Sequence, residues 1–291
     1  MISINGATKL VGILGWPLGH TLSPYMHNAA FQSLGLNWAY VPLPTAPEQI
    51  KDAIGSLQTF NFRGANVTVP HKQAIMRYLD EIDSVAHNIG AVNTIAIRDG
   101  KTFGYNTDCY GFLQSLIEAD FDPRGARCLI LGAGGAARAA VFSLAQAGAA
   151  AVAVYNRTVE RAAFLVDDLQ SEFQRVSFSF GSLTPKDLRA ADHHFDLIVN
   201  TTSVGMTPAA ENNPWPNEIP LPNAVVCDLV YNPLQTQFLQ QAKAAGLKTI
   251  DGVGMLIHQG AQAFEIWTGQ TPPTDVTRRV VLEQLQTRER K

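Results

Sequence analysis

The sequence predicts an α/β fold with two domains. Its 291 residues exceed the usual length of one domain. Short apolar runs alternate with helical patterns, which favours strands joined by helices. The alternation pauses near Thr107 and restarts at Arg127. We therefore place one α/β domain before the pause and a second after it.

The first half predicts a small α/β domain of βαβαβ order. Ser23 and Pro24 are a good N-cap and first residue for a helix, and Gly35 is a good stop. Asp99-Gly100 has the residue preference of a two-residue hairpin turn. The expected strands are residues 10–14, 38–41, 65–69, 94–98 and 101–103, and the expected helices are residues 23–34 and 48–57.

The second half predicts buried parallel strands, because helices or long connections separate the apolar runs. Five prolines between residues 208 and 222 predict a stiff, irregular loop. The expected strands are residues 128–131, 151–155, 195–200, 225–229 and 248–250, and the expected helices are residues 136–147 and a segment after Gly254.

Composition and charge restrict the function classes. The chain is 46% hydrophobic, and 22 basic against 25 acidic residues give a net charge of -3. This balance argues against a disordered chain and against a nucleic-acid partner. Three cysteines without CxxC spacing support neither a disulfide framework nor a zinc site, and they fit a reducing cytoplasm.

Two apolar segments are candidate targeting or membrane signals. Gly15 and Pro17 interrupt the run near the N-terminus, so no signal peptide is expected. Gln146 and Gly148 interrupt the uncharged stretch at residues 139–156, which a helix followed by a strand explains better than a membrane span. We expect a soluble protein.

A glycine-rich segment predicts a dinucleotide site. Residues 132–137 read GxGxxA between a predicted strand and a predicted helix. Glycines let the backbone approach a pyrophosphate, which the free N-H groups of the helix N-terminus then bind. A purely structural turn is the alternative. The candidate residues are Gly132, Ala133, Gly134, Gly135 and Ala136.

The residues after the next strand favour NADP over NAD. An NAD enzyme normally presents an acidic residue here to the ribose 2'-hydroxyl. This chain has Asn156, Arg157 and Thr158 instead, followed by Arg161. Two guanidinium groups without a carboxylate suit a 2'-phosphate. The alternative is that both arginines only lie on a solvated helix start.

Polar residues near the first predicted helix form a candidate carboxylate site. Thr21 and Ser23 bring two hydroxyls beside the free N-H groups of that helix. From chemistry alone, helix capping is the better interpretation of Ser23. His20 and His27 have no acidic or cysteine ligands nearby, so no metal is expected.

A lysine and an aspartate form a candidate proton-transfer pair. Lys72 follows a buried strand in the segment 66–72, and Asp108 ends the triplet 106–108. Open α/β sheets bind ligands at the carboxyl ends of their strands. The ammonium could bind a developing alkoxide while the carboxylate orients it. Without further information, a surface lysine is the simpler interpretation.

These segments together resemble the shikimate dehydrogenase family. The resemblance rests on residues 15–28, 66–72, 90–94, 106–108, 132–137, 156–158, 200–206, 228–233 and 255–267. It implies NADP-dependent interconversion of 3-dehydroshikimate and shikimate, on the route through chorismate to aromatic amino acids. The substrate and cofactor are small molecules, and a homodimer stays open.

The resemblance also implies a role for individual residues. Lys72 and Asp108 would be catalytic and would also touch the substrate. The substrate would be bound by Thr21, Ser23, Asn66, Thr68, Asn93, Tyr231 and Gln259. Besides the glycine turn and residues 156–158 and 161, the cofactor would be bound by Thr201, Ser203, Leu229, Gly252 and Met255.

The implied architecture is a discontinuous substrate domain around a Rossmann-type NADP domain. The substrate domain would comprise residues 1–107 and 252–291, the NADP domain residues 108–251, and the active site would lie in the cleft between them. The family usually has serine at Thr21 and glycine at Cys109. We expect Thr21 to narrow the carboxylate site, which leaves quinate use open, and Cys109 to be a packed residue rather than a reactive thiol.

Three alternatives stay open at this point. A quinate/shikimate dehydrogenase-like paralogue would act on another hydroxy acid, and a non-catalytic NADPH-binding sensor would keep the fold without turnover. A bifunctional folate dehydrogenase would share the two-domain plan, but the segments around Lys72 and Asp108 do not favour it.

Overall fold

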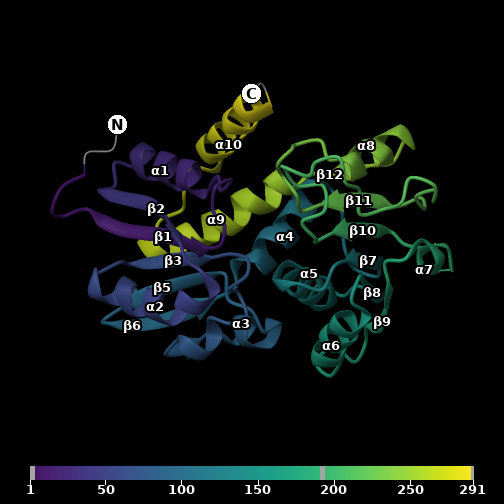
Figure 1. The fold of residues 1–291 in the computed structure, drawn as a ribbon, viewed down its shortest axis with the longest axis horizontal. Coiled ribbons are helices and arrows are strands. Elements are labelled where there is room, and N and C mark those ends of the chain that lie inside the picture. Colours follow the sequence, from purple (N-terminus) through teal and green to yellow (C-terminus); the bar gives the residue numbers. More distant parts are fainter. Residues whose placement is uncertain (1–3, 191–193, 290–291) are drawn as a thin grey trace. The chain divides into compact units, whose positions relative to one another are not determined.

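The computed structural model describes residues 4–190 and 194–289, which form two compact units (Figure 1). The first unit comprises the chain up to Gly111 and the segment from Ile257 onward, and the second runs from Phe112 to Leu256. The chain passes between the units inside two helices, α4 (Thr107–Glu118) and α9 (Gly252–Thr268). The predicted changes of domain, at residues 107/108 and 251/252, fall at the first residues of these helices.

The first unit is built on a mixed sheet of six strands in the order β2-β1-β3-β5-β6-β4. Strand β1 pairs in parallel with β2 and β3, whereas β5 is antiparallel to both β3 and β6. The strands are β1 (Lys9–Gly15), β2 (Trp38–Pro44), β3 (Gly64–Val67), β4 (Glu81–Ile82), β5 (Thr94–Arg98) and β6 (Lys101–Tyr105).

Helices cover both faces of this sheet. Helix α2 (Ile50–Thr59) buries Ile50, Ile54 and Leu57 in one core cluster. Helices α1 (Ser23–Ser33) and α9 contribute Phe31 and Phe264 to a second cluster. The unit is completed by α3 (Ser84–Ile89), α10 (Thr274–Glu289) and 3-10 helices at Pro47–Gln49 and Met76–Tyr78.

Two local predictions for the first unit have different outcomes. The hairpin turn is confirmed: Asp99 and Gly100 both have positive φ, 50° and 76°, as a type I' turn requires. The N-cap prediction for Ser23 is wrong, because Leu22 is the N-cap and Ser23 is already helical. Pro24 is near the helix start as expected, since its fixed φ suits the first turn.

The second unit is a six-stranded sheet that is parallel throughout, in the order β12-β11-β10-β7-β8-β9. The parallel prediction is confirmed, and this order is the doubly wound arrangement of dinucleotide-binding folds. The strands are β7 (Arg127–Leu131), β8 (Ala151–Asn156), β9 (Ser177–Ser182), β10 (Leu197–Asn200), β11 (Val225–Asp228) and β12 (Thr249–Ile250). The helices between them are α5 (Gly135–Gln146), α6 (Val159–Gln170), α7 (Pro185–Ala190) and α8 (Gln237–Ala244).

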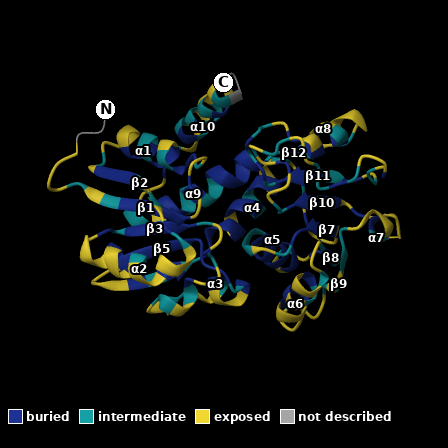
Figure 2. Ribbon diagram, viewed as in Figure 1, coloured by how far each residue is buried: buried dark blue, intermediate teal, exposed yellow. Residues whose placement is uncertain are grey.

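The core of the second unit lies along its central strands, which are buried (Figure 2). The proline-rich segment 208–222 forms no helix or strand, as predicted. It nevertheless supplies Trp215 and Ile219 to the core, and the Trp215 indole donates a 2.9 Å hydrogen bond to the Ile219 carbonyl. The irregular loop is therefore a packed part of the unit.

Candidate functional site

Lys72 and Asp108 form an ion pair in the first unit. The Lys72 Nζ lies 2.6 Å from Asp108 Oδ2, and the two side chains are only 15% and 6% exposed. Lys72 lies in the loop after β3, and Asp108 lies in the first turn of α4. The pair combines an oriented cationic donor with a buried anion, which is the arrangement needed for proton transfer to a developing alkoxide.

Asn93 fixes the other oxygen of Asp108. Its Nδ2 donates 2.8 Å to Asp108 Oδ1 and 2.9 Å to Thr107 Oγ1, while its Oδ1 accepts the backbone N-H of Thr107 at 2.7 Å. Both ends of the amide are thus assigned, and the carboxylate is held by Asn93 on one side and by Lys72 on the other.

Asn66 extends this network across the sheet. It lies near the end of β3, opposite Thr94 of β5, and its Nδ2 donates to Thr94 Oγ1 at 3.0 Å. Thr94 Oγ1 in turn donates to Asn93 Oδ1 at 3.1 Å. The residues Asn66, Thr94, Asn93, Thr107, Asp108 and Lys72 form what we call the first-unit network.

Thr68 lies just beyond β3, close to the end of β1. A Cβ built on Gly15 would lie 2.4 Å from Thr68 Cγ2, so glycine is needed there for the two segments to approach. Thr68 is half-buried and its backbone N-H donates to the Leu14 carbonyl at 2.9 Å. Local backbone packing therefore places Thr68 at the same end of the sheet as Asn66.

Thr21 and Ser23 lie together at the start of α1. The Ser23 backbone N-H donates to Thr21 Oγ1 at 3.3 Å, and the Ser23 side chain makes no capping bond. Thr21 is half-buried and Ser23 is buried. The Ser23 hydroxyl therefore does not cap α1, contrary to the capping interpretation.

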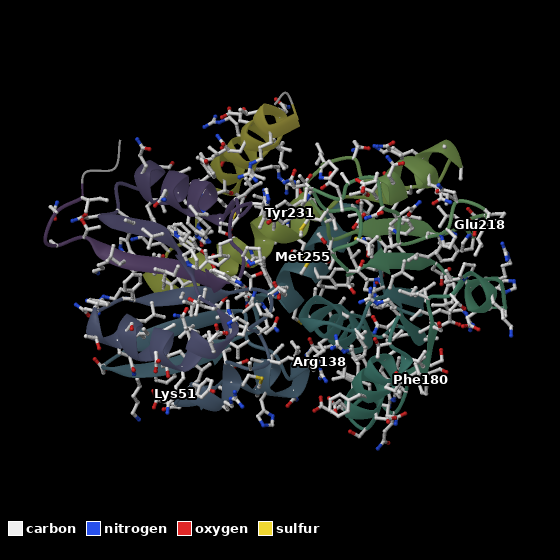
Figure 3. The ribbon with its side chains drawn as sticks, viewed as in Figure 1. Lys51, Arg138, Phe180, Glu218, Tyr231 and Met255 are labelled. Atoms are coloured by element: carbon white, nitrogen blue, oxygen red, sulfur yellow. The ribbon has the colours of Figure 1, made fainter. Side chains whose placement is uncertain are left out.

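Gln259 belongs to the first unit through α9. A Cβ on Gly111 of α4 would lie 2.6 Å from the Gln259 backbone nitrogen, so Gly111 lets α4 pass close to α9 at this point. The Gln259 side chain is half-buried. Tyr231 and Met255, both labelled in Figure 3, belong to the second unit, where Tyr231 is half-buried and Met255 is buried.

The glycine turn of the second unit connects β7 to α5. Gly132 has a φ of 115°, and a Cβ there would lie 2.6 Å from Thr201 Oγ1. Gly134 is the N-cap of α5, which begins at Gly135. Ala133 and Ala136 are half-buried around this turn. The backbone N-H groups at the start of α5 thus lie beside a surface without side-chain bulk, as a pyrophosphate requires.

Arg157, in the loop after β8, and Arg161, in the first turn of α6, have no acidic partner among the described residues. The Asn156 side chain donates to the Thr158 carbonyl at 2.8 Å, which closes the loop. Arg157, Thr158 and Arg161 are exposed. Within residues 4–190 and 194–289, neither Arg157 nor Arg161 forms an ion pair, so both guanidinium groups are available to an anion.

Three of the other predicted cofactor residues, Thr201, Ser203 and Leu229, lie on loops that follow β10 and β11, whereas Gly252 is the first residue of α9. Thr201 donates its hydroxyl to the Leu131 carbonyl at 2.8 Å, beside Gly132, whereas Ser203 is exposed in the next turn. A Cβ on Gly252 would lie 2.5 Å from the Leu229 carbonyl oxygen, so these two residues are neighbours.

A second buried network was not predicted from the sequence. Asp228 is fully buried at the end of β11. It accepts hydrogen bonds from Thr236 Oγ1 at 2.6 Å, from Asn200 Nδ2 at 2.9 Å and from the Val230 backbone at 3.0 Å. Burial raises the pKa of Asp228 to about 6, although the three donors oppose this rise. We call Asn200, Asp228 and Thr236 the second-unit network.

Arg138 is a further residue that sequence reasoning missed. It lies on α5, labelled in Figure 3, and its side chain pairs with Asp168 of α6. Its guanidinium also lies 5.6 Å from the centre of the Phe164 ring. A single charge within a helix of small apolar residues was the signal available, because such a charge needs a buried partner.

Other chemistry is limited in the described part of the chain. No group of three or more potential metal ligands lies together among these residues. Cys109, Cys128 and Cys227 are buried and form no disulfide, and burial raises the pKa of the Cys128 thiol to about 12. None of the described helices combines the length and apolarity that crossing a bilayer needs.

The fold and these sites define a class of protein. A parallel sheet of this order with a glycine turn is typical of proteins that bind dinucleotides, and the first unit adds a lysine–aspartate pair for proton transfer. Together they define a dinucleotide-dependent oxidoreductase.

Family models match three parts of the chain. The shikimate dehydrogenase substrate binding domain matches residues 13–95, the shikimate/quinate 5-dehydrogenase model matches residues 115–207, and the shikimate 5'-dehydrogenase C-terminal domain matches residues 252–282.

Whole-length relatives agree with these matches. The shikimate dehydrogenase (NADP(+)) of Moorella thermoacetica is 48% identical over 97% of this chain and 96% of its own. A crystal structure of a shikimate dehydrogenase in complex with NADP+ is 42% identical, with a TM-score of 0.89 over 97% of this chain and 98% of the other. A structure from Thermus thermophilus in complex with NADP(H) and shikimate is 37% identical, with a TM-score of 0.83 over 95% and 99%. The chain belongs to the shikimate dehydrogenase family.

Proposed function

We propose that the protein is an NADP-dependent shikimate dehydrogenase that reversibly reduces 3-dehydroshikimate to shikimate, a step toward chorismate and the aromatic amino acids. The observation that carries the proposal is the buried pair of Lys72 and Asp108, fixed by Asn93, in a chain of this family. A non-catalytic sensor would have no need to keep a lysine and a carboxylate in this arrangement.

The proposed substrate residues of the first unit have chemistry that suits shikimate. Thr21 and Ser23 hold the carboxylate, since their hydroxyls lie at the start of α1 and the Ser23 side chain makes no capping bond. The hydroxyl groups of the substrate are held by Asn66, Thr68, Asn93, Asp108 and Gln259. Tyr231 of the second unit is a further proposed substrate residue.

NADP fits the residues of the second unit. The turn from Gly132 to Ala136 leaves room for the pyrophosphate at the start of α5. Arg157 and Arg161, which lack acidic partners in the described chain, favour the 2'-phosphate together with Asn156 and Thr158. Thr201, Ser203, Leu229, Gly252 and Met255 line the remainder of the cofactor site. When bound, NADP(H) supplies or accepts the hydride at the substrate carbon that bears the 3-hydroxyl.

Lys72 moves the proton that accompanies the hydride. During ketone reduction, the Lys72 ammonium donates a proton to the developing alkoxide, and Asp108 keeps that ammonium aimed. During alcohol oxidation, neutral Lys72 takes the hydroxyl proton, directly or through a water molecule, and later releases it to solvent. Asn93 keeps Asp108 in place in both directions.

Thr21 supports a second candidate substrate. Its methyl group narrows the carboxylate site compared with the serine usual in the family, and the model that matches residues 115–207 is described for both shikimate and quinate. Activity with quinate would therefore make Thr21 the residue to study.

The first experiment combines purified protein with shikimate or quinate and with NADP+ or NAD+, and follows the reduced nicotinamide by absorbance. Reduction with shikimate and NADP+ is the expected result. Cofactor reduction with quinate but not with shikimate would mean that quinate is the substrate. Reduction of NAD+ as efficiently as NADP+ would contradict the role of Arg157 in binding the 2'-phosphate. NADPH binding without turnover in any combination would favour the sensor.

Location and assembly are further parts of the proposal. The three cysteines are buried and form no disulfide, which suits a reducing cytoplasm. A homodimer stays a prediction, which sedimentation of the purified protein tests.

A further inference from the structure

Tyr40 contacts the first-unit network from outside it. This tyrosine lies in β2 and is only 2% exposed. Its hydroxyl lies 2.7 Å from Asn66 Oδ1 and donates to it. Sequence reasoning gave Tyr40 no role, because it lies 26 residues before Asn66.

This hydrogen bond determines which way the Asn66 amide points. An amide has one accepting and one donating end, and the two can exchange by a flip. Tyr40 occupies the accepting end, so Nδ2 faces Thr94 Oγ1 at 3.0 Å and the Asn93 carbonyl at 3.3 Å. Without the tyrosine hydroxyl, the buried Oδ1 would lose its donor, and the flipped amide would set Oδ1 against a carbonyl.

Tyr40 is itself held firmly by two consecutive residues of α1. The Asn28 side chain donates to the Tyr40 carbonyl at 2.9 Å and accepts the Tyr40 backbone N-H at 2.8 Å. Since β2 is an edge strand, these bonds satisfy backbone groups that no neighbouring strand reaches. The His27 ring stacks on the Tyr40 ring, with 4.5 Å between centres and 9° between planes.

These contacts join the two halves of the proposed substrate site. Helix α1 begins beside Thr21 and Ser23, which we assign to the carboxylate. Tyr40 connects that helix to Asn66, which we assign to a hydroxyl group. From Asn66 the hydrogen bonds continue through Thr94 and Asn93 to the ion pair of Asp108 and Lys72.

We propose that Tyr40 is a positioning residue for substrate binding, which acts by holding the Asn66 amide in the orientation that receives a hydroxyl group of the substrate. This inference rests on the proposed function, because it assigns Asn66 to the substrate. Tyr40 does not touch the reacting atoms, so it affects affinity rather than the proton transfer at Lys72.

The test is a double-mutant cycle of Tyr40→Phe and Asn66→Ala. Phenylalanine keeps the ring that stacks on His27 and removes only the hydroxyl. We expect Tyr40→Phe to raise the Kd of shikimate, measured by calorimetry without cofactor, about tenfold, as the loss of one buried hydrogen bond implies. The KM should rise by a similar factor and the kcat should change less than about threefold.

The second arm separates positioning from a general structural effect. In the Asn66→Ala background, Tyr40→Phe should change the Kd less than about twofold, because there is no amide left to orient. Tyr78→Phe is the matched control, since Tyr78 is a partly buried tyrosine of the same unit whose hydroxyl makes no hydrogen bond to the described residues. Asn66→Ser replaces Asn66→Ala if the latter does not fold.

Each outcome decides the proposal. An unchanged Kd in Tyr40→Phe, or an equal rise in both backgrounds, overturns the positioning role. Wild-type protein that binds shikimate without turnover contradicts the proposed function, yet the cycle still measures the coupling through Kd. Wild-type protein that neither binds nor turns over shikimate overturns both.

Discussion

Each unit contains a buried polar network that includes an asparagine near the end of a strand. The two networks differ in the charge of the groups that bond to the aspartate. In the first-unit network, Asp108 is paired with Lys72 at 2.6 Å. In the second-unit network, the donors to Asp228 among the described residues are all neutral: Thr236, Asn200 and a backbone N-H. Burial therefore raises the pKa of Asp228 to about 6.

The difference indicates that a buried, hydrogen-bonded carboxylate has a different function in each unit. In the first-unit network the carboxylate faces a cationic partner, which it can orient toward a substrate. A carboxylate held by neutral donors links the loops after β10 and β11, and it does so at an electrostatic cost. Two buried networks that look alike in sequence, each an asparagine followed later by an aspartate, thus differ in charge. The first suits the proposed proton transfer, and the second suits a structural role.

The largest effect is expected from breaking the charged pair. Lys72→Ala should lower kcat by at least about a thousandfold, with little change in the KM of shikimate, because the proton donor is lost while the binding groups stay. Steady-state kinetics measure both constants. Lys101→Ala is the control, since Lys101 is an exposed lysine beside Glu81 in the same unit. Near-normal turnover of Lys72→Ala would remove Lys72 from the mechanism.

A smaller effect is expected from the cations of the second unit that lack an acidic partner in the described chain. Arg157→Ala should raise the KM of NADP+ about 10- to 100-fold and leave the KM of NAD+ nearly unchanged, because only NADP+ carries the 2'-phosphate. The KM of shikimate should stay the same. Arg175→Ala, another exposed arginine of this unit, is the control. Equal losses with both cofactors would mean that Arg157 does not read the phosphate.

Replacing Asp228 tests whether its pKa is raised in the folded protein, because the unfolding free energy then depends on pH. The pKa of Asp228 is raised in the folded state from 3.8 to about 6, so its stabilising contribution is complete below about pH 4 and is lost as the pH rises through 6. Relative to Asp228→Asn, the wild type should lose about 3 kcal/mol of unfolding free energy between pH 3 and pH 7. Denaturant unfolding at several pH values measures this difference. A constant difference would show that Asp228 is charged in both states.

The smallest effect concerns His27 of the first unit. Burial lowers its pKa from 6.5 to about 3, so its stabilising contribution is present above pH 6.5 and is lost as the pH falls toward 3. Compared with His27→Phe, the wild type should lose about 2 kcal/mol of unfolding free energy between pH 6.5 and pH 5. His87→Gln, at an exposed histidine, should show no such trend. Parallel pH profiles for wild type and His27→Phe would contradict the prediction.

Sequence patterns predicted those turns, strands and helices whose signal lies in a few neighbouring residues. The turn at Asp99 and Gly100 and the strands of the second unit were predicted because turn chemistry and short apolar runs are properties of neighbouring residues. Helix α6 and strand β9 were not among the predicted elements. Strand β9 is mostly exposed or half-buried and carries no continuous apolar run, so its pairing with β8 had no strong local signal.

The candidate site likewise contains some residues that the sequence indicated and others that it did not. Lys72, Asp108 and Asn93 were selected by residue type and by the family resemblance, and the structure adds the bonds that join them. Ser23 was misassigned as a cap because Ser-Pro is a common helix start, whereas here the helix already includes Ser23. Tyr40 had no sequence signal, and Asp228 lay in a segment of the resemblance without any role being assigned to it, since the partners of both residues lie far along the chain.

The sequence by itself determined the α/β class, the glycine turn at Gly132 and the two cations at Arg157 and Arg161, and it selected Lys72 and Asp108 as the candidate proton-transfer pair. These depend on side-chain chemistry and on spacing over a few residues. Only the tertiary structure decided how Asn66 is oriented, that Tyr40 orients it, and that Asp228 is buried without a cation among the described residues. Orientation and burial depend on atoms brought together from distant segments, and no pattern of neighbouring residues contains that information.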